Sequence, residues 1–321
     1  METATKPSIS TYKNIKLDKS SLYELESLDE IVFLTNFFHQ LQLVLGSKFD
    51  DYIFYLYARS FSDILPESLE IKSSKRKVLI FLSNENYEKI DPRFPGDYYA
   101  IFKCYFPFDK FKEKVFPFPL GYVKKTVHQE VKDISKRNIT VFFAGNLNEN
   151  RIPIYKALSG SYVPAKFYQF YLKILKRKPQ FANIIKRDFR YKFPSSYLLF
   201  TNGFKKGLNA VEYSNKLYDS QIVLCPKGFH VSETFRHYEA MRAGCVIISE
   251  KLPDIYLYRN SPIIQVSNWQ EGLEFANKLL ADPELLKSYH EKVLHWWKNV
   301  CNEHSTALHV SNILNSLEKN N

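Results

Sequence analysis

Residues 219–254 limit the possible folds of this chain more than any other part of the sequence. They contain two short apolar runs, 221–225 and 245–248, on either side of a segment with the composition of a helix. The second run is apolar at every position, which is typical of a parallel strand covered on both faces of its sheet. We therefore predict a strand, a loop, a helix and a second parallel strand, connected as a right-handed crossover.

The predicted loop and the start of the predicted helix carry polar residues. Pro226-Lys227-Gly228 ends the first strand, Ser232 is the expected N-cap with Glu233 in the first turn, and Gly244 ends the helix. Ligands of parallel sheets bind beyond the carboxyl ends of the strands. The residues expected near such a crevice are Lys227, Gly228, His230, Ser232, Thr234, Arg236 and Glu239.

Arg236 and Glu239 have two interpretations. The start of a helix binds anions, so Arg236 and Lys227 are expected to hold a diphosphate there, and Glu239 would accept hydrogen bonds from a ribose diol. Alternatively, Arg236 and Glu239 pair on the helix surface, because they are three residues apart. Periodicity alone does not decide between the two.

The rest of the chain alternates strand-like and helix-like segments, which predicts an α/β fold. Strands are expected at 31–34, 52–57, 78–82, 98–105, 139–144, 197–200 and 262–266, and helices at 36–45, 210–217, 269–280, 283–300 and 305–317. A charged break at 124–138 predicts two Rossmann-like domains, 1–130 and 138–290. The helices of 291–321 are expected to cross back onto the first domain.

A second candidate binding feature follows the strand at 139–144. Gly145-Asn146 comes at once after this strand, and a glycine there lets the backbone approach a phosphate. Arg151 begins the next helix. On its own, Arg151 has the pattern of a helix-surface residue.

Charge and cysteine content limit the class of protein. The net charge of +11 and the pI near 9.2 favour nucleic acid, anionic lipid or phosphorylated partners. Basic clusters occur at 72–77 and, interleaved with aromatics, at 173–187, and the plain alternative for both is a solvated face. Four scattered cysteines without a C-x-x-C pair argue against a zinc ribbon or a disulfide scaffold. Without a signal peptide or an apolar span, we expect a cytoplasmic protein, peripheral at most at a membrane.

Residues 225–249, CPKGFHVSETFRHYEAMRAGCVIIS, resemble the exostosin-type glycosyltransferase signature, with its C-P-x-G, R-x-x-E-A and A-G-C elements. FFAG followed by Arg151, and FPFPLGY at 116–122, resemble further parts of that family. The resemblance implies a GT-B fold, in which two Rossmann-like domains face each other across a cleft and the second binds a nucleotide sugar. It also implies that Arg236 holds the diphosphate, that Glu239 holds the ribose, and that Thr234 and Gly228 line the phosphate loop. The chain departs from the family in lacking a proline after Gly244-Cys245 and in an unmatched N-terminal half.

Inverting glycosyl transfer needs a base that takes the proton of the acceptor hydroxyl. Glu85, after the strand at 78–82, is the candidate, and Asp97 and His39 are rivals, although His39 also has the pattern of a core histidine. No D-x-D triplet follows a strand, so we expect no metal and no cofactor besides the donor. The expected acceptor is a glycan or a lipid-linked glycan, with an anionic membrane surface as a further partner and no specific nucleic acid.

Two alternatives remain from the sequence. The basic, aromatic cluster at 173–187 is compatible with a nucleic-acid-binding protein, although no known nucleic-acid motif is present. The departures from the exostosin-type pattern are compatible with a non-catalytic interaction protein of the same fold.

Overall fold

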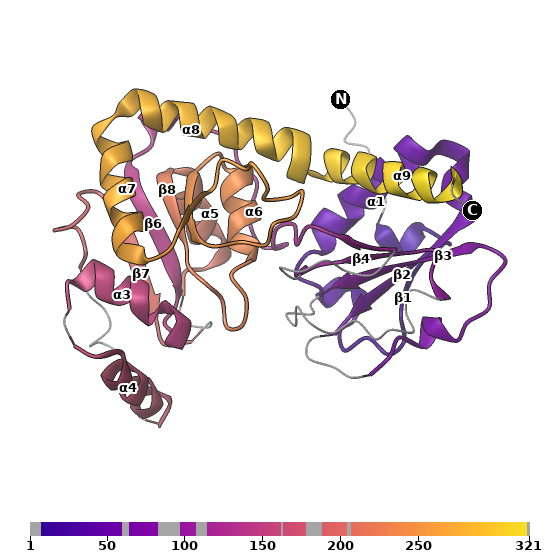
Figure 1. Ribbon diagram of the computed structural model, residues 1–321, viewed down its shortest axis with the longest axis horizontal. Coiled ribbons are helices and arrows are strands. Elements are labelled where there is room, and N and C mark those ends of the chain that lie inside the picture. The colour runs from indigo at the N-terminus through magenta and orange to yellow at the C-terminus, as the bar shows by residue number, and fades with distance from the viewer. Residues whose placement is uncertain are drawn as a thin grey trace. The chain divides into compact units, whose positions relative to one another are not determined.

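The structure is a computed structural model that describes residues 8–59, 64–82, 97–106, 114–161, 163–177, 188–203 and 207–319. The chain divides into two compact units (Figure 1). Unit 1 comprises Met1–Lys124, Pro253–Arg259 and Lys298–Asn321, and unit 2 comprises Lys125–Leu252 and Asn260–Trp297.

Unit 1 is built on a parallel five-stranded sheet whose strands are neighbours in chain order. The strands are β1 (Ile15–Leu17), β2 (Tyr52–Ala58), β3 (Arg76–Leu82), β4 (Ala100–Lys103) and β5 (Val115–Pro117). All residues of β2 are buried, as expected for a central strand covered on both faces. The prediction of an α/β fold is therefore confirmed for this half of the chain.

Among the described residues, the helices of unit 1 are α1 (Ile31–Leu45) and α9 (Glu303–Lys319), which pack against each other. The predicted strand at 31–34 is wrong, because these residues form the first turn of α1. The buried side chains Phe33, Phe37 and Leu41 recur at helical spacing along α1. A run of four apolar residues cannot be distinguished from a buried helix segment by periodicity alone.

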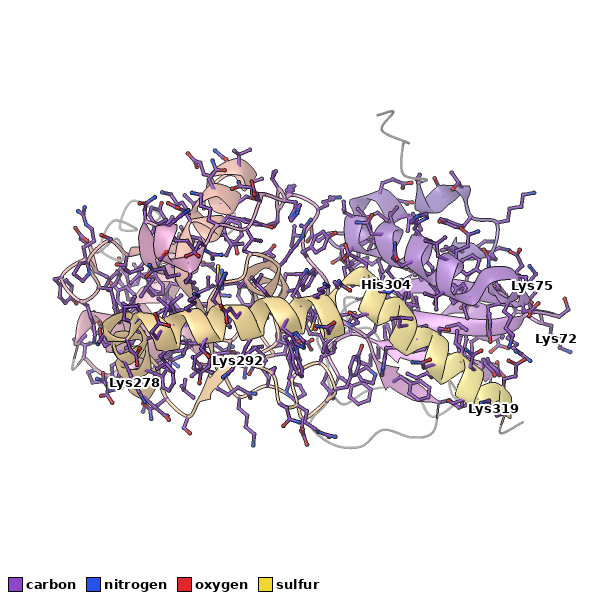
Figure 2. The ribbon with its side chains drawn as sticks, turned by 90° about the horizontal axis from the view of Figure 1, so that it is seen from above. Lys72, Lys75, Lys278, Lys292, His304 and Lys319 are labelled. Atoms are coloured by element: carbon purple, nitrogen blue, oxygen red, sulfur yellow. The ribbon has the colours of Figure 1, made fainter. Side chains whose placement is uncertain are left out.

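The two ends of α9 are fastened to unit 1 by side chains. Figure 2 shows His304 in the first turn of α9 and Lys319 at its end, with Lys72 and Lys75 on the same side of the unit as Lys319. Near that end Glu318 binds both Lys48 (2.9 Å) and Arg76 (3.1 Å). At the other end Tyr122 donates a hydrogen bond to Glu303 (2.6 Å).

The basic cluster at 72–77 is in part exposed and in part bound within unit 1. Lys72 and Lys75 are exposed, whereas Arg76 is bound by Glu318 and lies over the Tyr99 ring, 5.1 Å from its centroid. Lys77 donates to the backbone carbonyls of Ser68 and Leu69. These contacts are internal to unit 1 and account for Arg76 and Lys77, whereas Lys72 and Lys75 remain exposed.

Unit 2 contains a second parallel five-stranded sheet, with the order β10-β9-β8-β6-β7. Its strands are β6 (Ile139–Asn146), β7 (Tyr197–Thr201), β8 (Ser220–Cys225), β9 (Val246–Glu250) and β10 (Ile264–Val266). The helices are α3 (Ile152–Ser159), α4 (Ala165–Arg177), α5 (Ala210–Tyr218), α6 (Phe235–Arg242), α7 (Trp269–Ala281) and α8 (Pro283–Trp296). The chain leaves β6 toward β7 and then crosses to β8 on the other side of β6, so the strand order reverses at β6.

The predicted crossover at 219–254 is confirmed, since β8 and β9 are parallel neighbours joined through α6. Gly244 has a φ of +69° after the last helical turn, which a glycine adopts easily. The predicted N-cap is wrong, because α6 starts three residues later than Ser232 and is capped by Thr234. Glu233 precedes the helix and is buried, where it accepts a hydrogen bond from Tyr238 (3.0 Å).

Short helical turns complete the described part of the chain. They are η1 (Ile9–Thr11), η2 (Leu25–Ser27), η3 (Gly46–Asp51), η4 (Glu67–Leu69), η5 (Ile134–Lys136), η6 (Glu149–Arg151) and the π-helical η9 (Trp297–Cys301). The last of these separates α8 from α9, where the sequence predicted one helix over 283–300. Within the described residues, no helix is both long and apolar enough to span a bilayer.

Candidate functional site

The carboxyl ends of β6 and β8 lie side by side at the point where the strand order of unit 2 reverses. Ligands of open parallel sheets bind at such switch points. Gly145 and Asn146 end β6, and the loop of residues 226–234 follows β8. Asn150 joins the two segments, because its side-chain amide donates to the carbonyls of Gly228 (2.9 Å) and Phe229 (2.7 Å).

Two arginines from different elements converge on Gly145. The guanidinium carbon of Arg236, from α6, lies 4.7 Å from the ring centroid of Phe143, and that of Arg151 lies 5.7 Å from the same ring. Arg236 donates to the Ala144 carbonyl (2.6 Å), and Arg151 donates to the Asn146 carbonyl (2.7 Å). Backbone carbonyls and one aromatic ring therefore orient both cations toward the end of β6.

Neither arginine has a carboxylate partner within the described residues, where no salt bridge includes Arg151 or Arg236. The Nε of Arg236 is buried and has no hydrogen-bond partner. Burial, and to a smaller extent the charge of Arg236, lowers the pKa of Arg151 to about 9. Two cations that lie together without a bound carboxylate among the described residues form a site whose electrostatic cost an anion would offset.

Gly145 leaves the space that the arginines use. A Cβ on this residue would lie 3.0 Å from Arg236 Nη2 and 3.1 Å from Arg151 Nη1. The ring of Phe143, which is fully buried, lies 3.1 Å from the same position, so an alanine would press on this ring as well as on the two side-chain ends. The glycine predicted from the sequence thus permits a close approach of side chains from both flanking elements.

We expect Gly145→Ala to weaken binding of a nucleoside diphosphate about 10-fold, equal to about 1.4 kcal/mol, because both guanidinium groups must move. The free energy of unfolding should fall by about 1 kcal/mol, because the buried ring of Phe143 must also shift. Isothermal titration with UDP and chemical denaturation measure the two quantities. Unchanged UDP affinity in this variant would show that the arginines do not meet at the ligand.

Glu239 does not pair with Arg236, so the ion-pair interpretation of these two residues is wrong. Its carboxylate, 5% exposed, accepts a hydrogen bond from Thr126 Oγ1 (2.6 Å) at one oxygen and from the Tyr213 hydroxyl (2.8 Å) at the other. Burial, followed by the negative charge of Glu239, raises the pKa of Tyr213 well above its usual value. Tyr213 is therefore protonated and acts as the donor.

The loop after β8 uses several of its backbone N–H groups internally. The Lys227 N–H donates to Glu250 (2.7 Å), whose other carboxylate oxygen accepts from the Trp269 indole (2.8 Å). The Gly228 N–H donates to the Val231 carbonyl (2.9 Å). An anion at this loop would therefore meet side chains rather than these two N–H groups. His230 is exposed, whereas Lys227, Ser232 and Thr234 are half-buried.

The start of α6, which carries Arg236, is positioned by His237. Ser249 donates its hydroxyl proton to the Cys225 carbonyl (3.2 Å), so His237 Nε2, 2.8 Å from that hydroxyl oxygen, is the protonated nitrogen. The Nδ1 of His237 then accepts from the backbone N–H of Thr234 (3.2 Å). Burial lowers the pKa of His237 to about 4, so the ring is neutral at pH 7. Strand β9 thereby sets where the helix begins.

A cavity of about 500 Å³ adjoins the end of β6. The side-chain amides of Asn146, Asn148 and Asn150 contribute to its wall, together with Phe229 from the loop after β8. Leu172 and Lys173 of α4 close another side. The cavity thus lies between the residues at the end of β6 and a helix that the sequence did not connect with them.

Two of the three candidate bases, Asp97 and His39, lie among the described residues. Glu85 lies outside the described residues. Asp97 is exposed and precedes β4, so it belongs to the amino-terminal edge of the sheet of unit 1, opposite the edge where strands end. His39 is half-buried in the middle of α1.

Several residues of the site were not found from the sequence. Phe143 lies within an apolar strand run, and Thr126 and Tyr213 have no motif around them. Glu250 offered a signal, because it is the first charged residue after the apolar run of β9. The spacing of Asn146, Asn148 and Asn150 after β6 offered another.

No protein-family model matches the sequence, and no curated protein matches it either. Among solved structures, an alpha-glucosyltransferase (AGT) in complex with UDP has a TM-score of 0.50 at 13% identity, covering 94% of this chain and 98% of that one. A glycosyltransferase from Rickettsia africae ESF-5 has a TM-score of 0.49 at 13% identity, with coverages of 92% and 84%. The fold of this chain is therefore the α/β GT-B fold with two parallel sheets, as predicted. The narrower exostosin-type resemblance stays a prediction.

Proposed function

We propose that this chain is a glycosyltransferase that moves a sugar from a nucleotide-sugar donor to a glycan or lipid-linked glycan acceptor. The observation that carries the proposal is the pair Arg151 and Arg236, which converge on Gly145 without a carboxylate partner in the described residues. A diphosphate has the charge and the size to bind both guanidinium groups. The similarity of fold to an alpha-glucosyltransferase in complex with UDP supports the same assignment.

In this proposal, Arg151 and Arg236 stabilise the leaving group. The bond between the sugar C1 and the β-phosphate oxygen breaks, and the acceptor oxygen forms a new bond to C1. The acceptor proton passes to a base, and negative charge develops on the nucleoside diphosphate. Two preorganised cations at that position would lower the barrier in the way that oxyanion donors do. The two arginines would supply the compensating positive charge without a metal ion, so metal-independent transfer is part of the proposal.

The nucleoside is assigned to the residues around the two arginines. Glu239, on the same helix as Arg236, is the proposed ribose contact, because each carboxylate oxygen has a lone pair beyond those used by Thr126 and Tyr213. His230, Ser232 and Thr234 are proposed donor contacts from the loop after β8. The amide-lined cavity beside Asn146, of about 500 Å³, has room for the remaining part of the donor.

Inversion with Glu85 as the base is proposed for the acceptor half of the reaction, with Asp97 and His39 as the rivals. A lipid-linked acceptor would be met at an anionic membrane surface, which is the proposed macromolecular partner.

The proposal is tested by incubating the protein with uridine, guanosine, adenosine and thymidine diphosphates and their sugars. We expect one nucleoside diphosphate to stabilise the fold by about 2.7 kcal/mol at 100 times its Kd, and its sugar to be hydrolysed or transferred. Thermal unfolding and release of the free diphosphate are the measurements. If no nucleotide shifts the unfolding transition at millimolar concentration, the function is not glycosyl transfer from a nucleotide sugar. NMR of the anomeric proton in the product tests inversion.

The ribose contact is tested by comparing UDP with its 2′-deoxy analogue. We expect the intact chain to prefer UDP about 10-fold, and Glu239→Gln to reduce that preference to about 2-fold, because the charged acceptor of the diol is lost. Titration calorimetry on both proteins gives the coupling between Glu239 and the hydroxyl. If Glu239→Gln weakens both nucleotides equally, Glu239 acts through Thr126 and Tyr213 rather than on the ribose.

A further inference from the structure

Helix α4 has two faces with different chemistry. Tyr168, Tyr171 and Leu172 face the core of unit 2 and pack against its apolar cluster. Tyr168 also donates a hydrogen bond to Ser161 (2.8 Å). Figure 1 shows α4 beyond α3 at the rim of this unit. The inward face therefore attaches the helix to unit 2, and the outward face takes no part in this attachment.

The outward face presents phenylalanines in water. Phe167 is 60% exposed and Phe170 is 62% exposed, three residues apart and hence neighbours on the helix surface. Val163, just before the helix, is 38% exposed. Large apolar side chains grouped at the surface mark a place that binds another apolar phase. Two phenylalanine rings exposed to water on one helical face are energetically unfavourable, and packing of the helix against unit 2 does not require them.

Lysines frame the phenylalanines. Lys166 and Lys173 are exposed, and with Phe170 they form one row along the helix at the spacing i, i+4, i+7. No salt bridge of the described residues includes either lysine. A helix with phenylalanines and unpaired lysines on one face lies in the interface of an anionic bilayer, with its rings among the acyl chains and its ammonium groups at the headgroups. The net charge of +11 also favours binding to an anionic surface.

We propose that the outward face of α4, formed by Lys166, Phe167, Phe170 and Lys173, docks this protein on anionic phospholipid. Nucleic acid is the less suitable partner, because the exposed rings lie on a convex helix and the tyrosines of the same helix point inward. Lys173 and Leu172 of α4 also line the amide-rich cavity next to Asn146. The docking face and the wall of the candidate donor site are thus parts of one helix. The inference that docking serves a lipid-linked acceptor rests on the proposed function, whereas docking itself does not.

The test is sedimentation of the full chain with vesicles of phosphatidylcholine, with and without phosphatidylglycerol. We expect binding only to the anionic vesicles. Phe167→Ser/Phe170→Ser should weaken it about 30-fold, equal to about 2 kcal/mol at 1.4 kcal/mol per tenfold. Lys166→Glu should weaken it about 10-fold. Val211→Ser is the matched control, because Val211 on α5 is 57% exposed in the same unit, and it should bind as the intact chain does.

Unfolding midpoints measured without vesicles report whether each variant is folded, and UDP binding measured without vesicles reports on the proposed function separately. Equal binding to both kinds of vesicle, or no binding to either, would overturn the docking assignment. So would anionic binding that survives both the phenylalanine and the lysine substitutions. If a single-stranded oligonucleotide binds through the phenylalanine pair and the anionic vesicles do not, the face is a nucleic-acid surface and the proposal is wrong.

Discussion

Arg236→Ala is expected to weaken binding of a nucleoside diphosphate about 100-fold, equal to about 2.7 kcal/mol, while the fold stays intact. Arg236 donates one hydrogen bond, to the Ala144 carbonyl, and its Nε is buried without a partner, so little structure depends on it. Burial and the charge of Arg236 together lower the pKa of Arg151 to about 9. Removal of Arg236 therefore also removes a positive charge that acts on Arg151. Titration calorimetry with UDP measures the affinity, and denaturant unfolding measures the stability.

Two further variants separate the causes of that loss. Arg190→Ala removes the same charge from unit 2 at a residue that is paired with Asp188 and exposed, so it should leave UDP affinity unchanged. Arg236→Lys retains the positive charge but not the planar guanidinium group, so it should weaken UDP binding about 10-fold. If Arg190→Ala weakens UDP as much as Arg236→Ala does, only the net charge of the protein matters and no specific diphosphate contact exists.

Gly121→Ala is expected to destabilise the protein by about 3 kcal/mol. Gly121 has a φ of +70°, and a Cβ there would overlap the ring of Phe33. Phe33 is fully buried in α1, and its ring lies 5.8 Å from that of Tyr122 and 6.4 Å from that of Phe118. The ring cannot move without displacing these neighbours, so the strain is not relieved. Urea unfolding followed by circular dichroism measures the change.

Gly46→Ala is the matched control for this prediction. Gly46 has a φ of +55° at the end of α1, but a Cβ there would meet nothing within 4 Å. The Gly46→Ala substitution should lower the free energy of unfolding by only about 1 kcal/mol, which is the backbone part of the effect. Equal losses in the two glycine variants would show that the Phe33 overlap contributes nothing.

Much of unit 2 was predictable from local sequence. The strand–helix–strand unit around α6 follows from two uninterrupted apolar runs and from Gly244, and each of these signals acts over a few residues. The strand at 139–144 and the glycine at its end were predicted in the same way. The first turn of α1 was mistaken for a strand, because a short apolar run carries no period of its own.

The candidate site was predictable only in part. Its position followed from the rule that parallel sheets bind ligands at the carboxyl ends of their strands, and Gly145 and Arg236 were selected on that ground. Arg151 was selected only through the resemblance to the exostosin-type family. The N-cap was misplaced, because the burial of Glu233 under Tyr238 depends on packing and not on the local sequence. The candidate base Glu85 and its rivals Asp97 and His39 stay predictions, since a carboxylate after a strand has no signature of its own.

The sequence by itself determined the secondary structure around α6, the α/β class and the arginine and glutamate that mark this helix, because these depend on neighbours a few residues apart. Only the tertiary structure decided which groups meet. It brings Arg151 and Arg236 together at one glycine, and it pairs Glu239 with Thr126, 113 residues away, rather than with Arg236. The physical reason is that the strand order reverses at β6, and this reversal joins loops that are distant in the chain.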